Sequence, residues 1–390
     1  MLGLTSRNEE RAITSSDTGW GDWGDSSTTS WSGVTITRDT SMQLLAVHGS
    51  VRMISESIAT LPADTYRSEK VRNDRGETDM RVPTRPPPWL VTPSNDLDWT
   101  SFVSQVLNGL LLDGNSYIQL STGSDGQIRE LIPLADSRVT VSKELSTKVI
   151  RVDGRKVSSG ELLHIPGMMF PGAVVGLSPI EYARQTIGLG LAATEYWAGW
   201  FDRDGNMPGV IELPRIAQPD VMRKMARQWK AKRTRSGKGL PGVLDDGAQW
   251  KPTGVTSEQM QFLQTRKYSA GEIAGQLFLL DPTDLGIPVE GSSISYANLD
   301  QRNVRRVQVT FLPHIIRLER ALTTLLPRMQ FVKLNVDGIL RGDAKSRYES
   351  YKIGIESGFL TIDEVREMED RQPLPPAPEE APVAEPPPAP

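Results

Sequence analysis

The chain of 390 residues has no cysteine, which excludes disulfide bonds, thiolate metal sites and a cysteine nucleophile. Histidine is nearly as scarce, because His48, His164 and His314 are the only three. No apolar run approaches the roughly 18 residues that a membrane-spanning helix needs, and the N-terminus has no signal-peptide core. We therefore expect a soluble, non-exported protein of a reducing compartment, with no membrane partner.

Charge and motifs exclude further classes. The chain has 44 basic and 48 acidic residues, a formal net charge of −4, so any contact with DNA must be local or non-adhesive. It lacks the Gly-x-x-x-x-Gly-Lys-Ser/Thr sequence that cradles phosphates, so we expect no ATP hydrolysis. His164 and His314 have apolar neighbours and are expected to be packed side chains. A nuclease metal site of Asp281, Asp284 and Glu290 is a minor alternative, because their Pro- and Gly-rich context lacks a known ligand loop.

The most distinctive stretch is a long helix predicted for residues 178–204. Ser178 can cap it, Pro179 suits its first position, and Glu181 completes a capping box. Such a helix would be about 40 Å long, and its apolar residues point to several sides, so it must be covered on several sides. Glycine and alanine in its middle indicate that other helices approach closely there. The residues expected to make this packing are Ile187, Gly190, Ala193 and Trp197.

The remaining elements predict an α+β fold. Residues 1–40 are rich in Ser, Thr, Gly and Asp and are expected to form a disordered arm, and the Pro-rich residues 373–390 a disordered tail. Hydrophobic periodicity predicts further helices and many short strands. The helices are expected at 41–61, 99–112, 218–233, 256–279, 296–325 with a bend near Pro313, 343–357, and after Thr361. The strands are expected at 65–67, 116–120, 130–133, 139–141, 149–152, 161–165, 210–213, 242–245, 249–252 and 331–335.

One predicted helix is strongly basic. Between Arg215 and Lys238 nine basic residues accompany a single acid, Asp220. Such a helix favours an electrostatic docking surface for a partner protein, while phosphate contacts with nucleic acid and a merely solvated helix face remain open alternatives. The candidate docking residues are Arg223, Lys224, Arg227, Lys230, Lys232 and Arg233.

Several short words, in this order over residues 41–372, resemble the portal proteins of long-tailed double-stranded-DNA bacteriophages. Three of them are Leu-Asp-Gly-Asn-Ser-Tyr at 112–117, Gly-Leu-Ser-Pro at 176–179 and Ser-Tyr-Ala-Asn-Leu-Asp-Gln at 295–301. Family members often have Ala-Tyr where this chain has Ser116-Tyr117. The other words are Ala46-Val47, 58–62, 250–252, 261–263, Leu312-Pro313, 340–343, 358–361 and 364–366.

The resemblance implies a ring of subunits, usually twelve, at one vertex of the capsid, through which double-stranded DNA is packaged and ejected without sequence specificity. It also implies partners: the terminase large subunit, the head-to-tail adaptor, the major capsid protein and the scaffold. The location would be the virion, with assembly in the host cytoplasm. A virion subunit without a channel, or a metal-dependent nucleic-acid enzyme, are the alternatives.

Carried onto this sequence, the resemblance implies a division of the chain into named parts. These are a wing (41–177), a stem helix (178–204), a small α/β clip (205–255), a second stem helix (256–280), a channel loop (281–295), a long wing helix (296–327), and a distal wing with a short crown (328–372). The channel-loop residues are Glu290, Gly291, Ser292, Ser293 and Ser295. No basic residue lies between Asp281 and Gln301, so this loop is expected to touch DNA without holding it.

Overall fold

The structure is a computed structural model. It describes residues 29–73, 76–144, 147–202, 209–212, 219–220, 222–224, 227, 249–252, 269–287, 296–336, 339, 344–369 and 372. The chain divides into two compact units, residues 1–335 and 336–390, and each is described by itself. Among the described residues, no helix is long and apolar enough to cross a membrane.

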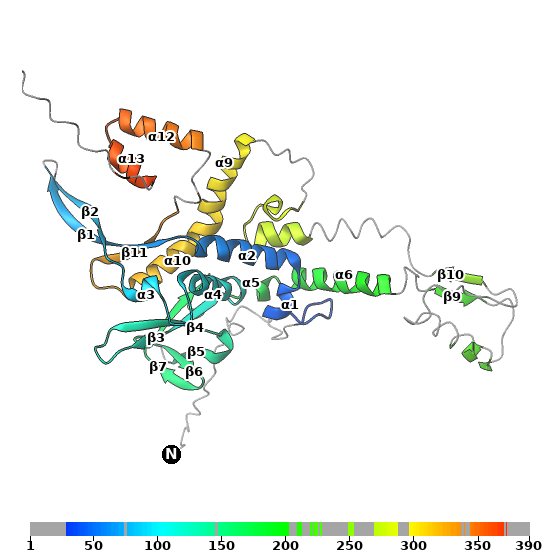
Figure 1. The fold of residues 1–390 in the computed structure, drawn as a ribbon. Helices are drawn as coiled ribbons and strands as arrows, with labels where there is room; N and C mark the ends of the chain where they lie inside the picture. The colour runs from blue at the N-terminus through cyan, green and yellow to red at the C-terminus, as the bar shows by residue number, and fades with distance from the viewer. Residues whose placement is uncertain are drawn as a thin grey trace, which may run out of the picture. The chain divides into compact units, whose positions relative to one another are not determined.

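The core of the first unit lies around two packed helices, α2 (Leu45–Ala59) and α4 (Trp99–Leu112) (Figure 1). Both have apolar residues at helical spacing, so each buries one face against the other. Asp98 caps α4 by accepting a hydrogen bond from the Ser101 N–H at 3.1 Å. The fully buried side chains of the two helices include Val47, Ile54, Ile58, Phe102, Val106 and Leu107.

Three antiparallel three-stranded sheets accompany these helices, with strand orders β11-β1-β2, β4-β3-β8 and β5-β6-β7. Tyr117, Val141, Leu162 and Val175 form a buried cluster between the last two sheets. The strands are β1 (Ala63–Asn73), β2 (Gly76–Thr84), β3 (Asn115–Thr122), β4 (Ile128–Leu134), β5 (Val139–Glu144), β6 (Thr147–Val152), β7 (Arg155–Val157), β8 (Leu162–Pro166) and β11 (Gln330–Leu334).

The β1–β2 hairpin is longer than its third strand. β1 pairs with β2 from Thr65 to Asn73, but β11 pairs only with residues 63–67 of β1. Tyr66 of β1 stacks on Phe331 of β11, with ring centroids 5.9 Å apart. The outer part of the hairpin is therefore a two-stranded ribbon, and Figure 1 shows it extending past the end of β11.

The predicted long helix is present as two segments, α5 (Pro179–Tyr182) and α6 (Arg184–Asp202), which meet at Ala183. Ser178 caps α5 as predicted, because its Oγ accepts a hydrogen bond from the Glu181 N–H at 3.3 Å. The interruption at Ala183 is slight, since the Ile187 N–H still bonds the Ala183 carbonyl at 3.0 Å.

The arm expected to be disordered through residue 40 is structured from Thr29, which corrects the sequence prediction. A Thr29–Thr35 bridge precedes helix α1 (Arg38–Met42), which Thr37 caps. The physical reason is burial: Ile36 and Ser30 are almost inaccessible, although the composition of the arm is polar. A Cβ built on Gly188 would come within 2.2 Å of the Ser30 Oγ, so the arm fills the groove that this glycine leaves in α6.

The bend expected near Pro313 is present as a π-helical segment. The chain runs from α9 (Tyr296–Arg305) through π-helical Arg306–Phe311 into α10 (Leu312–Thr323). Proline has no N–H and its ring crowds the preceding turn, which this widened turn relieves. A second π-helical segment, Ile273–Leu277, precedes the 3₁₀ turn Pro282–Leu285. The buried Glu319 joins α10 to β11 by bonds to Lys333 Nζ (2.7 Å) and the Leu334 N–H (2.9 Å).

The other described parts are small. Strands β9 (Gly209–Glu212) and β10 (Gln249–Pro252) pair antiparallel, and residues 219–220, 222–224 and 227 are helical. The predicted strand at 242–245 lies outside the described residues. The short helix α3 (Pro88–Val91) follows Pro86 and Pro87. In the second unit, the helix predicted after Thr361 is α13 (Ile362–Met368), which follows α12 (Ala344–Glu356) and begins with a capping box of Thr361 and Glu364.

Candidate functional site

Two of the sequence words meet in the first unit, at a junction formed by residues 112–116 and 176–178. The Asn115 amide lies at its centre: its Oδ1 accepts from the Gly176 N–H at 2.7 Å, and its Nδ2 donates to the Gly176 carbonyl at 3.0 Å. Nδ2 also donates to the Asp113 carbonyl at 3.1 Å. The Ser178 hydroxyl donates to the Leu112 carbonyl at 2.9 Å. The junction thus fixes the start of α5 on the end of α4.

Two glycines let the backbones approach this closely. Gly114 has φ +70°, and a Cβ there would lie 1.9 Å from the Leu177 carbonyl oxygen. A Cβ on Gly176 would lie 2.1 Å from the Gly114 carbonyl oxygen. That oxygen accepts a hydrogen bond from the Gly167 N–H at 2.8 Å. Both positions therefore require glycine, one for its dihedral angle and its space and the other for space alone.

His164 of β8 completes the hydrogen bonds of Asn115. Its Nε2 lies 3.0 Å from the Asn115 Oδ1 and its Nδ1 contacts the Lys148 Nζ, so a neutral ring donates to the amide and accepts from the ammonium. Its ring stacks on Tyr117 with centroids 4.7 Å apart. Burial, with a contribution from the Lys148 cation, lowers the pKa of His164 to about 3. His164 is the packed side chain that the sequence predicted.

A second group of contacts ties residues 281–284 to α9 and the π-helical turn that follows it. Arg306 forms two bonds to the Asp284 carboxylate, Nε to Oδ2 at 2.9 Å and Nη2 to Oδ1 at 2.6 Å. Arg302 pairs with Asp281 at 3.1 Å and with Asp284 at 3.4 Å. The Asp284 side chain is 8% exposed, so this bidentate pair is largely shielded from solvent. We call these four residues the loop-base ion pairs.

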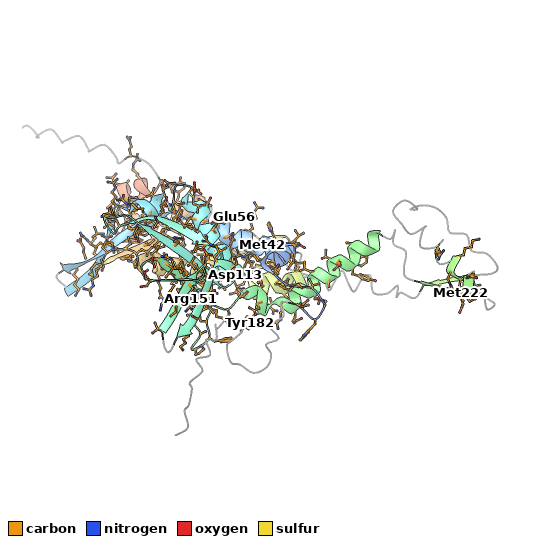
Figure 2. All side chains as sticks on the ribbon, turned by 90° about the horizontal axis from the view of Figure 1, so that it is seen from below. Met42, Glu56, Asp113, Arg151, Tyr182 and Met222 are labelled. Atoms are coloured by element: carbon orange, nitrogen blue, oxygen red, sulfur yellow. The ribbon has the colours of Figure 1, made fainter. Side chains whose placement is uncertain are left out.

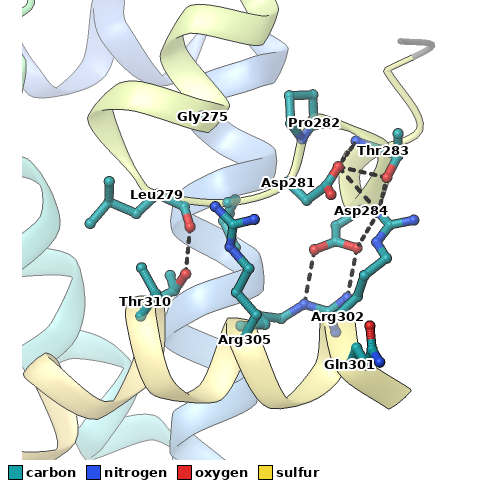
Figure 3. Close-up of a pocket in the computed structure, with 13 residues that line it drawn as sticks. Gly275, Leu279, Asp281, Pro282, Thr283, Asp284, Gln301, Arg302, Arg305 and Thr310 are labelled. Carbon is teal, nitrogen blue, oxygen red and sulfur yellow. Dashed lines mark hydrogen bonds and ion pairs between the residues drawn. The ribbon is translucent and has the colours of Figure 1, made fainter. Parts of the chain in front are cut away.

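All four residues of the loop-base ion pairs line a pocket of about 680 Å³. Figure 3 shows Asp281, Asp284 and Arg302 at its wall, where Leu279 and Thr310 also meet. The Thr310 hydroxyl donates to the Leu279 carbonyl at 2.5 Å. Asp281 accepts from the Thr283 N–H at 3.0 Å and so caps the 3₁₀ turn. Burial acts to raise the pKa of Asp281, but the Thr283 bonds and the Arg302 cation hold it below its usual value.

The loop-base ion pairs bear on the minor nuclease alternative. The carboxylates of Asp281 and Asp284 are engaged by arginines, while Glu290 lies outside the described residues. Among the described residues, no group of three or more His, Asp or Glu side chains is placed to hold a metal ion. The geometry thus favours a structural role for the two aspartates.

The residues predicted for helix packing lie on α6. Ile187, Gly190 and Ala193 are buried, and Trp197 is half-buried. A Cβ on Gly190 would come within 3.1 Å of the Leu44 side chain, so this glycine receives a residue of the same chain. The small residues in the middle of α6 thus accommodate residues 30 and 44 of the same chain, and their role between subunits stays a prediction.

The other predicted site residues are only partly described. Arg223, Lys224 and Arg227 are exposed. Lys230, Lys232 and Arg233, and the expected channel-loop residues Glu290, Gly291, Ser292, Ser293 and Ser295, lie outside the described residues. The words around Asn115 and Gly176 are part of the family resemblance, but the sequence did not predict that they touch. Sequence reasoning also missed Arg302 and Arg306, which form i,i+4 neighbours on one helix face, the spacing that could have revealed them.

Comparison with known proteins identifies the family. A sequence profile described as phage portal protein matches residues 45–370. The "Probable portal protein" of Streptomyces phage phiC31 is 33% identical over 372 residues, covering 88% of this chain and 78% of that protein. The "Portal protein" of Enterobacteria phage HK97 is 28% identical over 346 residues, covering 86% of this chain and 80% of that protein.

Solved structures agree in fold. An HK97-family phage portal protein from Corynebacterium diphtheriae has a TM-score of 0.60 at 15% identity, covering 79% of this chain and 98% of that chain. A chain from the neck of a native gene transfer agent particle, computed with C12 symmetry, has a TM-score of 0.53 at 21% identity, covering 86% of this chain and 94% of that chain. The protein described here therefore belongs to the phage portal protein family.

Proposed function

We propose that this chain assembles into a ring, of twelve copies, that conducts double-stranded DNA into and out of a phage capsid. The observation that carries the proposal is the portal-family match over residues 45–370, together with a shared fold in a neck assembly computed with C12 symmetry. The ring lies at the portal vertex of the virion and contacts the major capsid protein, with scaffold present during assembly in the host cytoplasm.

The parts of the chain take the roles that the resemblance implies. Residues 41–177 form the wing, α5 and α6 the first stem helix, and residues 281–295 the channel loop. The loop-base ion pairs support the last assignment, because they fasten the residues on both sides of 288–295 to each other. The boundary between the two units near residue 336, after residues 330–334 and before α12 and α13, supports a division of residues 328–372 there into the distal wing and the crown.

The basic helix is the docking surface for the terminase large subunit and then for the head-to-tail adaptor. Arg223 and Arg227, at i,i+4 spacing, and Lys224 are exposed, as a docking surface requires. The test is an Arg223→Glu/Lys224→Glu variant compared with Lys143→Glu/Lys156→Glu, an equal charge change on two exposed lysines of β5 and β7. We expect rings from both variants and impaired terminase binding from the first alone. If both variants bind terminase equally well, the basic helix is a solvated face and not a docking surface.

The ring itself is tested by negative-stain electron microscopy of the purified chain, together with its mass in solution. We expect rings with a central hole wide enough for duplex DNA, formed alone or with scaffold. Closed particles without a hole would favour a virion subunit that has no channel. A monomer that persists with scaffold would contradict the ring.

A further inference from the structure

An exposed apolar patch lies beside the junction described above. It consists of Met168, Met169 and Phe170, from the loop between β8 and α5, and Tyr182 at the end of α5. Met168 is 64% and Tyr182 58% exposed. The Phe170 and Tyr182 rings meet edge to face with centroids 6.3 Å apart, so the four side chains form one surface. Figure 2 labels Tyr182 of α5, beside the start of α6.

The backbone beneath this patch is held in place. The Met168 carbonyl accepts a hydrogen bond from the Leu177 N–H at 2.7 Å, and the Phe170 carbonyl accepts one from the Ala173 N–H at 3.1 Å. The Gly167 N–H bonds the Gly114 carbonyl of the junction. A surface fixed in this way loses little conformational freedom when a partner binds, which favours affinity.

The patch continues along α6. Exposed apolar side chains recur every seven residues here: Tyr182 at the end of α5, then Leu189 and Tyr196 on α6. Seven residues bring a helix back to nearly the same side, so the three side chains form a line about 21 Å long. A line of this period is the pattern to which another helix or a long surface packs.

The charge of the patch selects among occupants. No Asp, Glu, Lys or Arg occurs from Gly167 to Ile180, and beside Tyr182 the acid Glu181 is balanced by the base Arg184. Nucleic acid and anionic lipid surfaces are bound through Lys and Arg, so this surface suits neither. Methionine and aromatic side chains without charge are typical of the buried centre of protein–protein contacts. A neck assembly of the same fold was computed with twelvefold symmetry, which places identical copies side by side.

We infer that Met168, Met169, Phe170 and Tyr182, with the line along α6, form the surface that contacts a second copy of this chain in the ring. The inference rests on the proposed ring and adds the surface on which neighbouring copies meet. A ring contact is heterologous, so this patch meets a different surface of the neighbour and the contact repeats around the ring. Because every copy carries the same substitution, a change that weakens this contact weakens it at every position around the ring.

The experiment compares Met168→Glu with Met80→Glu, which places the same charge on a similarly exposed methionine of β2, 56% exposed. Ring fraction is measured by mass in solution and electron microscopy at equal protein concentration. We expect Met168→Glu to lower the ring fraction at least tenfold, with an unchanged circular dichroism spectrum, and Met80→Glu to leave it unchanged. Because the chain has no cysteine, Met168→Cys and Met80→Cys can each take one environment-sensitive dye. We expect the dye on residue 168 alone to shift to shorter wavelength when rings form.

The possible results separate the two proposals. If the unaltered chain forms no rings even with scaffold, both the ring and this contact surface are contradicted. If it forms rings, while Met168→Glu assembles like Met80→Glu and the dye on residue 168 keeps its monomer spectrum, the contact surface alone is wrong. A misfolded Met168→Glu variant leaves the dye measurement to decide, because cysteine is a mild replacement for an exposed methionine.

Discussion

The junction around Asn115 and the loop-base ion pairs both hold together segments that are distant in sequence. They do so by different chemistry. The junction uses neutral groups: an amide that forms four hydrogen bonds and two glycines with no room for a side chain. The loop base uses the opposite charges of Asp284 and Arg306 at its centre. The junction fixes its segments by shape, so its stability should be insensitive to salt. The loop base depends on the attraction between opposite charges, so its geometry can adjust when those charges change.

The largest effect should follow a change of Gly114. Gly114→Ala places a Cβ against the Leu177 carbonyl and also requires an unfavourable φ, so we expect a loss of about 4 kcal/mol or more in the free energy of unfolding. Gly126→Ala is the control, because Gly126 has φ +74° and nothing within 4 Å; it should cost about 1 kcal/mol. Urea unfolding of both variants makes the comparison. Equal losses would show that the junction is not tightly closed.

Asn115 should come next. In Asn115→Asp the acceptor stays, but the two hydrogen bonds that Nδ2 donates are replaced by a buried carboxylate facing the Gly176 carbonyl. We expect a loss of about 3 kcal/mol, because a buried charge would lie against a carbonyl. Asn95→Asp, at an exposed amide, is the matched control. An Asn115→Asp variant as stable as Asn95→Asp would remove the amide from the centre of the junction.

The loop base should respond to charge. Asp284→Asn should cost about 2–3 kcal/mol, because it leaves Arg306 without its bidentate partner. Unlike the junction variants, the double exchange Asp284→Arg/Arg306→Asp should recover part of that loss. Thermal unfolding of the single variants Asp284→Arg and Arg306→Asp and of the double variant gives the coupling energy. A double variant as unstable as the sum of its singles would show that the pair is not coupled.

The smallest effect, over the range from pH 7 to pH 5, concerns the neutral state of His164. Its pKa is about 3 in the folded chain and about 6.5 when unfolded, so the unfolded chain binds the extra proton. Stability is therefore complete above pH 6.5 and falls as the pH decreases toward 3, by up to about 1.4 kcal/mol per pH unit for one group. His164→Gln, which keeps a donor without titrating there, should flatten the profile of urea midpoints between pH 7 and 5. Identical pH profiles for the two proteins would show that the pKa of His164 is not lowered in the folded chain.

Sequence reasoning predicted elements better than their contacts. Helical spacing located α4, and capping residues located α5 and α13, because these signals are local. It expected no strand in the region of β2 and placed the end of the disordered arm at residue 40. Those errors share a cause: a strand of polar residues and a polar arm become ordered only through partners far away in the chain.

The candidate sites show the same division. That Gly188 accommodates Ser30 depends on which segments meet in space, which composition does not show. Local sequence patterns predict a helix thinned by glycine, but not which segment fills the groove. Arg302 and Arg306 carried a usable signal, since like charges at i,i+4 spacing repel and are favoured beside acidic partners. Only the fold identifies Asp281 and Asp284 as those partners.

The β1–β2 hairpin has a consequence for local opening. Over residues 65–67, β1 is paired with a strand on both sides, but from Ser68 to Asn73 its strand partner is β2 alone. A two-stranded ribbon in water is marginally stable by itself. Amide hydrogens along this single strand should therefore exchange with solvent at two rates, slowly near the sheet and quickly toward the tip. The ribbon is in effect a compliant extension, able to twist against a surface while its root stays fixed.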